Sequence, residues 1–407
     1  MEIDDVDPTS PEVMLTFYRR LYPFKSIFHW LNQDANPTRR FTQREFAFTL
    51  PGDIYLRYQS FNSAEDLKKQ VCQLNPSRFE IGPVYSARPR DKKTLRPGVL
   101  VPIQRELVFD IDMTDYDPVR TCCSGAGICK RCWGFIAAAV HVLDGAIRDN
   151  FGYQNLLWVY SGRRGIHLWI SDSEALSLTD DHRKALVEFV SMNLGGETGN
   201  KRLNIRSKNV PPSIRHAADM LNQKFPDLVL ADQECFDGEN GSETLLSMLP
   251  PDIVSSLRKD WTANPYKSSE DKWEDLKLKA KADKSSVLLR ALQDIVLLYT
   301  YPRIDAEVSK HRNHLLKAPF CVHPKTGRVC VPVNPDQVEE FDPDTVPTVG
   351  QLLKELDAIP KDENSPYEHH ADWEKTSLKP YVDLLNQHAL RLMEQTKGAK
   401  REDDLSW

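Results

Sequence analysis

Residues 106–117 read ELVFDIDMTDYD and place carboxylates on a segment that otherwise has the composition of a buried strand. Alternate side chains of a strand share a face, so Asp110 and Asp112 project side by side with their Cα atoms about 6.6–6.8 Å apart. At roughly that distance two unpaired carboxylates repel by about 2–3 kcal/mol at an effective dielectric constant of 20. A fold that keeps this strand therefore favours a bound cation, and a pair of Mg²⁺ or Mn²⁺ ions is the usual device for displacement at phosphorus.

The alternative is an edge strand with a solvated acidic face. The chain has 59 acidic residues among 407, so acid-x-acid triplets also arise by chance. A third carboxylate would complete a metal cage, and Asp305 in YPRIDAEV is again an acid within apolar text that we interpret as a strand. Arg303 would share its face. Taken alone, Asp305 is equally compatible with a salt-bridged or surface aspartate.

A cluster of cysteines follows the acidic strand in CCSGAGICKRC. Its four thiols, Cys122, Cys123, Cys129 and Cys132, can surround one Zn²⁺, and the Cys129 to Cys132 spacing is typical of a zinc knuckle. Full thiolate coordination leaves no open position, so we predict a structural zinc that holds the loop between the strand and the next helix. Disulfides are the alternative, and a reducing compartment disfavours them.

Two basic segments are candidates for binding phosphate. YSGRRGIHLW follows an apolar strand and combines arginine forks with glycines that let backbone N–H groups approach an anion; its candidates are Ser161, Gly162, Arg163, Arg164, Gly165 and His167. NHLLKAPFCVHPKTGR carries His314, Lys317 and His323, with Lys325 and Arg328 in a turn. Such cations could hold the β- and γ-phosphates of a nucleotide, whereas a solvated turn is the alternative for either segment.

The remaining text is mixed α/β. We expect one or two helices within 13–32, two strands in FTQREFAFTL and DIYLRYQSF joined by a tight turn, a helix after Cys132 that ends near Gly152, and a strand pair in LLWVYSG and GIHLWIS. Residues 178–291 have helical periodicity. Strand-like text returns at IVLLYTYPRIDAEVS and GRVCVPVN, and helices follow near QLLKELDAI and KPYVDLLNQHALRLMEQ.

This order predicts one α/β domain interrupted by a helical insertion. The predicted parts are a first catalytic part at 1–178 with the zinc motif at 122–132, an insertion at 179–292, a second catalytic part at 293–345, and C-terminal helices with a charged, flexible tail at 346–407.

Composition narrows the setting but does not select a ligand. No apolar run is long enough to predict a membrane helix, and the acidic N-terminus is unlike a signal peptide or a mitochondrial presequence, so we expect the cytosol or nucleus and no membrane partner. The formal net charge is −6, so any nucleic acid must meet a local basic patch or a partner.

Taken together, VFDIDMTD, CCSGAGICKRC, VYSGRRGIH, PRIDAEVSKHRNHLLK and PFCVHPKTGR closely resemble the small catalytic subunit of eukaryotic-type DNA primase over most of residues 12–360. The resemblance implies a mixed-sheet primase (prim) fold with a helical insertion and a zinc knuckle. It also implies synthesis of short RNA primers on single-stranded DNA template from ribonucleoside triphosphates, in the nucleus. The implied partners are an iron–sulfur large subunit and the catalytic and accessory subunits of DNA polymerase α.

The resemblance also assigns residues. Asp110, Asp112 and Asp305 would bind two catalytic Mg²⁺ or Mn²⁺ ions, and Glu45 in REFAFTL matches a further acid that the family counts in its active site. The incoming nucleotide's triphosphate would meet Ser161, Gly162, Arg163, Arg164, Gly165 and His167, together with His314, Leu315, Leu316, Lys317 and His323. The four clustered cysteines match the family's zinc motif, and Arg303 is a possible addition.

The mechanism that we expect is two-metal nucleotidyl transfer, in which a 3′-hydroxyl attacks the α-phosphate and pyrophosphate leaves. Two other classes remain open from the residues alone. A metal-dependent nuclease or phosphatase would also use clustered carboxylates and arginines, and a non-catalytic, zinc-stapled binding subunit would need neither Asp305 nor the carboxylate pair.

Overall fold

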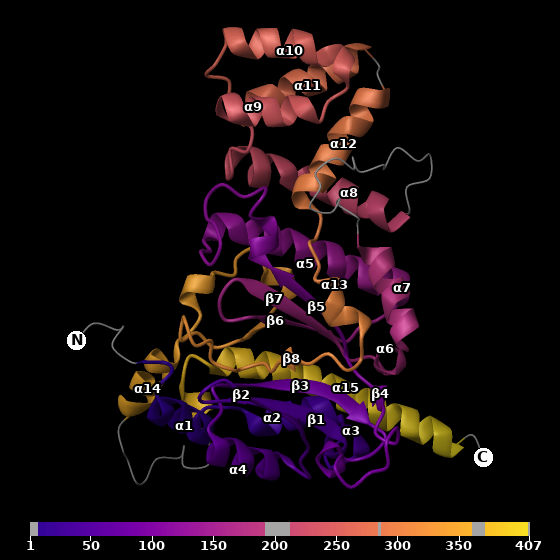
Figure 1. The fold of residues 1–407 in the computed structure, drawn as a ribbon, viewed down its shortest axis with the longest axis vertical. Helices are drawn as coiled ribbons and strands as arrows, with labels where there is room; N and C mark the ends of the chain where they lie inside the picture. Colours follow the sequence, from indigo (N-terminus) through magenta and orange to yellow (C-terminus); the bar gives the residue numbers. More distant parts are fainter. Residues whose placement is uncertain (1–6, 192–211, 284–285, 360–370, 406–407) are drawn as a thin grey trace. The chain divides into compact units, whose positions relative to one another are not determined.

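A computed structural model describes residues 7–191, 212–283, 286–359 and 371–405 (Figure 1). The chain divides into two units. The first consists of residues 1–110, 153–187 and 305–407, and the second of residues 111–152 and 188–304. This division differs from the predicted boundaries, because the cysteine segment and the helix after it belong with the helical residues rather than with the first catalytic part.

The first unit contains an antiparallel five-stranded sheet in the order β2-β1-β3-β4, with β8 paired to β3. Its strands are β1 (Arg44–Leu50), β2 (Ile54–Gln59), β3 (Arg78–Tyr85), β4 (Pro102–Gln104) and β8 (Leu316–Lys317). The predicted pair β1 and β2 is confirmed. Its turn places Gly52 and Asp53 at positive φ, which a tight hairpin turn requires.

A second sheet has the order β5-β7-β6-β9. Its strands are β5 (Leu107–Asp112), β6 (Leu156–Tyr160), β7 (Gly165–Ile170) and β9 (Pro332–Val333). The strands β6 and β7 form the predicted antiparallel pair, and every residue of both is buried, as expected for strands covered on both faces. β5 crosses the division between the units after Asp110.

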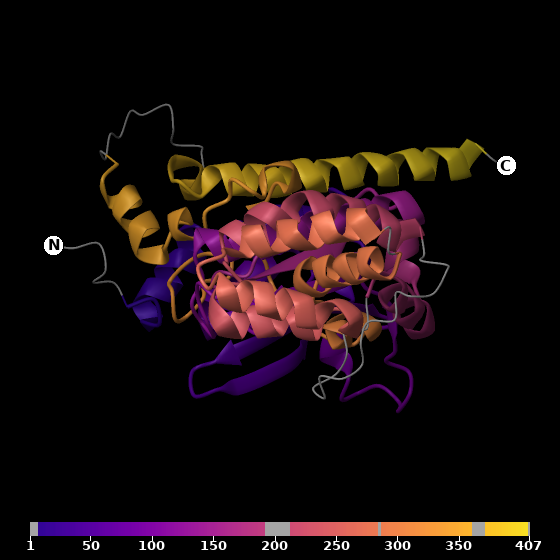
Figure 2. The ribbon, with the colours of Figure 1, turned by 90° about the horizontal axis from the view of Figure 1, so that it is seen from above.

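Helices cover these sheets in the first unit. They are α1 (Pro11–Arg20), α2 (Phe24–Asn32), α3 (Arg39–Thr42), α4 (Ala64–Leu74), α6 (Ser173–Ser177), α13 (Ala306–Lys310), α14 (Val349–Asp357) and α15 (Lys379–Leu405). The long helix α15, yellow in Figure 2, packs against α2. It continues to Leu405, so the charged tail that we expected to be flexible is helical as far as Leu405.

The second unit is helical beyond the acidic strand. It contains α5 (Lys130–Phe151), α8 (Pro212–Phe225), α9 (Gly238–Ser247), α10 (Pro251–Ala263), α11 (Ser269–Asp283) and α12 (Ser286–Thr300), with a π-helical turn at Pro226–Ala231. α7 (Asp180–Val190) crosses the division. α5 packs on α8 and ends at Gly152, whose φ of 72° caps the helix as predicted. Residues 192–211 and 284–285 of the predicted insertion lie outside the described residues.

Short 3₁₀ helices connect these elements: η1 (Pro89–Asp91), η2 (Met113–Tyr116), η4 (Pro335–Gln337), η5 (Pro343–Thr345) and η6 (Asp372–Lys375). In the described part of the chain, no helix combines the length and apolarity needed to span a bilayer.

The strand predicted over residues 295–309 is wrong. α12 extends to Thr300, an irregular stretch follows, and α13 begins at Ala306. A short apolar run such as IVLLYT does not distinguish a buried helix from a strand, and in α12 Leu288, Leu292, Ile295 and Tyr299 are buried at helical spacing. Arg303 and Asp305 therefore do not share a strand face. Of GRVCVPVN, Pro332–Val333 is strand, and Val329 forms an isolated bridge with Val322.

Candidate active site

Three distant segments of the first unit meet at Asp110. His167 of β7 lies with its Nε2 3.5 Å from Asp110 Oδ1, and the His167 side chain is 8% exposed whereas that of Asp110 is 27% exposed. The Asp305 N–H donates to the Asp110 carbonyl oxygen at 3.0 Å. Two predicted metal ligands and one predicted phosphate ligand are thus neighbours, with the carboxylate of Asp110 open to solvent.

Each of the other two aspartates caps a short helix. Asp112 Oδ1 accepts hydrogen bonds from the Thr114 N–H at 2.8 Å and the Thr114 hydroxyl at 2.7 Å, at the start of η2. Asp305 Oδ1 accepts from the Glu307 N–H at 3.0 Å, at the start of α13. Asp112 lies at the end of β5, in the residues counted with the second unit. Among the described residues, the aspartates do not form a group of three ligand atoms within 4.8 Å of one another.

Glu45 is fully buried on β1 and has several partners. Arg57 donates to it through Nε at 2.9 Å and through Nη2 at 3.2 Å, and the Tyr85 hydroxyl donates at 2.9 Å. The Tyr58 N–H adds a hydrogen bond at 3.1 Å. Burial and the Glu45 carboxylate raise the pKa of Tyr85. Glu45 therefore organises the side chains of β2 and β3 around itself.

The predicted phosphate segment forms a closed turn between β6 and β7. The Ser161 N–H donates to the Gly165 carbonyl at 2.9 Å, and the Gly165 N–H donates to Ser161 Oγ at 3.0 Å. Gly162 has a φ of 84°, and a Cβ there would lie 2.9 Å from His323 Cβ. The turn thus packs directly on the second basic segment. The arginines between its ends, Arg163 and Arg164, are partly exposed.

The second basic segment is bonded to the same turn. Lys317 Nζ donates to the Ser161 carbonyl at 2.5 Å, and the Thr326 hydroxyl donates to the Gly162 carbonyl at 2.7 Å. Burial, followed by the charges of Lys317, Arg163 and other cations, lowers the pKa of His323 to about 4. This surplus of positive charge would stabilise a bound polyanion through charge-assisted hydrogen bonds.

The start of the second basic segment, residues 314–317, joins the first sheet. Leu316 and Lys317 form β8, opposite Ile81 and Glu80 of β3. Burial and then Arg105 lower the pKa of His314, and the Asp305 carboxylate partly opposes that shift. Leu315 and Leu316 are buried, so their side chains support the fold while their backbone continues to Lys317.

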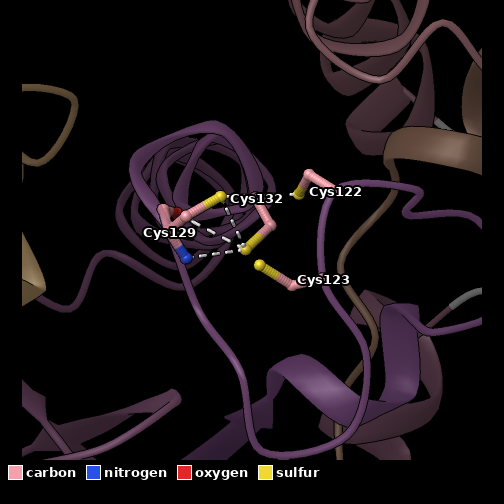
Figure 3. Close-up of side chains that lie close together, drawn as sticks. All are labelled: Cys122, Cys123, Cys129 and Cys132. Atoms are coloured by element: carbon pink, nitrogen blue, oxygen red, sulfur yellow. Dashed lines mark hydrogen bonds between the residues drawn. The ribbon is translucent and has the colours of Figure 1, made fainter.

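The four cysteines of the second unit converge as predicted (Figure 3). Their sulfurs lie within 4.8 Å of one another, with Cys129 Sγ 3.6 Å from Cys122 Sγ and 3.8 Å from Cys132 Sγ. Burial and the nearby thiols raise the pKa of Cys132 to about 12. Four clustered thiols ionise together only beside a cation, so this donor set fits a tetrahedral Zn²⁺.

Two residues that the sequence did not single out support the cysteine loop. Buried Arg120 donates to the carbonyls of Gly127 at 2.8 Å and Gly125 at 3.0 Å, and Asp117 pairs with it. Gln233 Nε2 lies 3.3 Å from Cys122 Sγ. The position of Arg120 beside the motif was a usable signal, whereas no sequence pattern links Gln233 to a cysteine 111 residues earlier.

Arg303 belongs to the second unit and has a structural set of contacts. Its Nη1 donates to the Asp115 carbonyl at 2.9 Å and its Nη2 to the Leu298 carbonyl at 3.2 Å, while its guanidinium lies 5.4 Å from the Tyr116 ring centroid. The prediction that Arg303 accompanies Asp305 on one strand face is therefore wrong, because neither residue is in a strand.

A buried ion network at the start of β5 was also missed. Arg44 binds Glu106 through two hydrogen bonds at 2.7 and 2.9 Å, and Arg105 Nη1 adds one at 3.3 Å; all three side chains are 1% exposed. Burial lowers the pKa of Arg105 to about 10. The Arg105 Nε donates to the His314 carbonyl at 3.3 Å, so the network connects β5 to the basic segment.

Comparison with known proteins is consistent with this arrangement. A family model described as DNA primase small subunit matches residues 109–335. The DNA primase small subunit of Schizosaccharomyces pombe is 45% identical, over 97% of this chain and 92% of that protein. Those of Saccharomyces cerevisiae and Drosophila melanogaster are each 39% identical, over 98% and 91% of this chain and 96% and 88% of theirs. The predicted resemblance is thereby confirmed: the chain belongs to the DNA primase small subunit family and is a primase, a DNA-directed RNA polymerase.

Proposed function

We propose that this chain synthesises short RNA primers on single-stranded DNA by transferring nucleotidyl groups from ribonucleoside triphosphates. The observation that carries the proposal is the meeting of Asp110, His167 and Asp305 in the same unit as the GRRG turn and Lys317. Carboxylates for cations and a positively charged cradle for a polyphosphate are the two parts that phosphoryl chemistry needs.

Asp110, Asp112 and Asp305 would hold two Mg²⁺ or Mn²⁺ ions. Two observations support this assignment of the metal ligands. Carboxylate oxygens suit hard divalent ions, and the Asp110 carboxylate is partly exposed to solvent. The Asp305 N–H also donates to the backbone carbonyl of Asp110. Alternation along β5 gives Asp112 the same face as Asp110. When bound, such ions lower the pKa of an attacking hydroxyl and neutralise charge on the leaving phosphates.

The chain's own side chains orient the reactants. His167 lies beside the Asp110 carboxylate and limits its rotation, because both are held on neighbouring strands. Arg163, Lys317 and His323 would bind the triphosphate so that its α-phosphate faces the 3′-hydroxyl of the growing RNA. As that hydroxyl loses its proton to solvent and attacks, and the bond to pyrophosphate breaks, Arg163 and Lys317 stabilise the charge that develops on the leaving group.

Glu45 has a positioning role in this proposal. Its carboxylate already accepts from Arg57, Tyr85 and the Tyr58 backbone, so it fixes the direction of Arg57 at the edge of the site. Ser161 and Gly165 close the turn on each other through their N–H groups, and Gly162 packs on His323, so these residues would hold Arg163 and Arg164 toward the phosphates. Leu315 and Leu316 would likewise hold His314 and Lys317 in place.

Zn²⁺ in the cysteine cluster would act structurally by joining the loop after β5 to the first turn of α5. The remaining assignments follow from the family resemblance: an iron–sulfur large subunit, the catalytic and accessory subunits of DNA polymerase α, and a nuclear location. Single-stranded DNA, the RNA primer and ribonucleotides complete the proposed set of ligands.

The test is Asp112→Ala in the full-length chain. Primer synthesis with Mg²⁺ or Mn²⁺ should be abolished while the protein stays folded, since the lost cap bond costs only about 1 kcal/mol. Asp342→Ala is the matched control, because Asp342 caps η5 through the Asp344 N–H at 2.9 Å. A folded Asp112→Ala protein that extends primers at the wild-type rate would contradict the metal assignment. Release of nucleotides from nucleic-acid ends, without synthesis, would favour a nuclease instead.

A further inference from the structure

A cavity of about 380 Å³ lies in the first unit between β2, β3 and the segment that follows η1. We call it the basic tyrosine pocket and define it by Arg57, Tyr58, Tyr85, Lys92 and Arg96, which line it. Among the described residues, its lining contains three cations and no aspartate or glutamate. Because Glu45 already pairs with Arg57, Lys92 and Arg96 give the pocket its preference for an anion. Tyr58 and Tyr85 line it together with leucine and proline side chains.

The segment that borders this pocket is strongly basic in a chain whose net charge is −6. Residues 88–98 read RPRDKKTLRPG, with five cations and one acid, and all five cations are exposed. Arg90 already donates to Asn62 at 3.2 Å and lies 4.0 Å from Asp66. Lys92 and Arg96 instead line the pocket, so these two cations of the segment are available to a ligand bound there.

Tyr85 is 4% exposed, so the partly exposed Tyr58 is the ring that a planar ligand could reach in this pocket. The rings of Tyr58 and Tyr85 have centroids 6.3 Å apart. Lys92 Nζ lies 3.4 Å and the Arg57 guanidinium 5.0 Å from the Tyr58 ring centroid. Lys92 therefore covers one face of this ring, and a base that stacks on that face has to displace its ammonium group toward a phosphate. Alternating cations and aromatic rings are what a single-stranded polynucleotide requires, since its phosphates need charge and its unpaired bases stack.

The backbone holds Tyr58 in an unfavourable conformation. Its φ is 61°, in the left-handed region that residues with a Cβ avoid, and its N–H donates to Glu45 at 3.1 Å. Strain of this kind persists where the surrounding structure over-determines it, which is common at ligand sites. Here the buried carboxylate of Glu45 sets both the backbone of Tyr58 and the side chain of Arg57.

The pocket lies beside the chain segment that carries His314 and Lys317. Asn313 also lines it, and the Arg57 Nη2 donates to the Asn313 carbonyl at 3.4 Å. The next residue is His314, a predicted phosphate ligand, and Lys317 follows three residues later. A strand in the pocket would thus lead directly to the proposed nucleotide site.

We propose that the basic tyrosine pocket binds an unpaired nucleotide of single-stranded nucleic acid, with phosphates at Lys92 and Arg96 and a base on Tyr58. The inference rests on the proposed function, because it is the polymerase reaction that brings such a strand to this site. A duplex does not present a free base face to a pocket, and an acidic peptide would have no use for the partly exposed ring of Tyr58. Template DNA and growing RNA share the chemistry, so the experiment compares both.

The experiment measures binding of fluorescent oligo(dT) and oligo(U) to the full-length chain over a salt series. Lys92→Gln/Arg96→Gln should weaken binding about tenfold and reduce the slope of log K against log salt by about 1.4, since each lost phosphate contact removes about 0.7. Arg88→Gln/Lys93→Gln is the matched control, because it removes the same charge from the same segment outside the pocket lining. The strand that shows the larger loss is the one that occupies the pocket.

Two further variants test the ring. Tyr58→Leu should weaken oligonucleotide binding with little change in salt slope, whereas Tyr58→Phe should bind like wild type, because stacking needs the ring and not the hydroxyl. Equal losses in the two charge pairs, or an unchanged salt slope in Lys92→Gln/Arg96→Gln, would overturn the inference.

Nucleotide binding separates this inference from the proposed function. Mg²⁺–NTP affinity should be unchanged in the pocket variants if the pocket binds only the strand. A wild-type chain that binds oligonucleotide through the pocket but synthesises no primer would refute the proposed reaction and leave the pocket intact.

Discussion

Replacing Gly162 by alanine should separate backbone strain from packing at the phosphate turn. A φ of 84° costs a residue with a Cβ about 1–2 kcal/mol, and the lost freedom of the unfolded glycine returns about 0.4–1 kcal/mol. The added Cβ would also lie 2.9 Å from His323 Cβ and 3.2 Å from the Arg328 carbonyl oxygen. Neither atom is the end of a flexible side chain, so overpacking adds about 1–3 kcal/mol. The total loss of unfolding free energy should be about 1–5 kcal/mol, with a central value of about 3 kcal/mol.

Gly52 supplies the matched control for this prediction. Its φ is 75° and no atom would lie within 4 Å of an added methyl group, so Gly52→Ala incurs the backbone cost alone, about 1 kcal/mol. Urea unfolding gives the stabilities, and titration with Mg²⁺–NTP gives the affinities. Displacement of His323 should weaken nucleotide binding by roughly ten- to a hundredfold in Gly162→Ala only. Equal losses of stability and affinity in the two variants would refute the reasoning.

Three other predictions follow from single sites. Cys129→Ser should abolish zinc binding and lower the melting temperature, whereas Cys72→Ser should do neither. Metal analysis checks this, with about one zinc ion per chain expected for the wild type. Mg²⁺–NTP binding at pH 5.5 should be accompanied by the uptake of up to about 0.9 proton, because the bound polyphosphate raises the pKa of His323 from about 4 toward 6.5. Calorimetry in two buffers of different ionisation enthalpy measures this uptake. His323→Asn should abolish it. Glu106→Gln should destabilise the fold by about 3–5 kcal/mol at pH 7, since it leaves Arg44 buried without its carboxylate. The arginines lower the folded pKa of Glu106 despite its burial, so its contribution is present above the unfolded value near 4.5 and is lost as the pH falls; urea unfolding of both proteins should converge in acid.

The local parts of the site could be predicted because their signals are local. Alternation placed Asp110 on a largely buried strand, β5, which lies at the edge of its sheet. The glycines around Arg163 marked a tight turn, and the spacing of Cys129 and Cys132 marked a shared ligand site. In each case the residues that act together lie within about a dozen positions, where strand and turn geometry fixes their separation.

What the sequence could not reveal are features that depend on tertiary contacts. Asp305 was expected on a strand, but α12 continues through the β-branched run because its buried face packs at helical spacing, which leaves Asp305 to cap α13. Gln233 contacts Cys122, which lies 111 residues earlier in the chain. Glu106, just before β5, pairs with Arg44 of β1 in the other sheet. A buried acid looks the same in sequence whether its partner is an arginine or a metal ion.

The distribution of charge in the first unit indicates how its ligands should bind. Asp110 and Asp305 supply negative charge beside His167, and the turn that precedes His167 in the chain carries Arg163 and packs on Lys317. A bare polyphosphate would be repelled by the carboxylates, and divalent ions alone would be repelled by the cations. A metal–nucleotide complex satisfies both groups at once, so each ligand lowers the electrostatic cost of binding the other. Mg²⁺ or Mn²⁺ should therefore raise the affinity of the protein for NTP by the same factor by which NTP raises its affinity for the metal. This reciprocal coupling should disappear when Asp110 is replaced by asparagine.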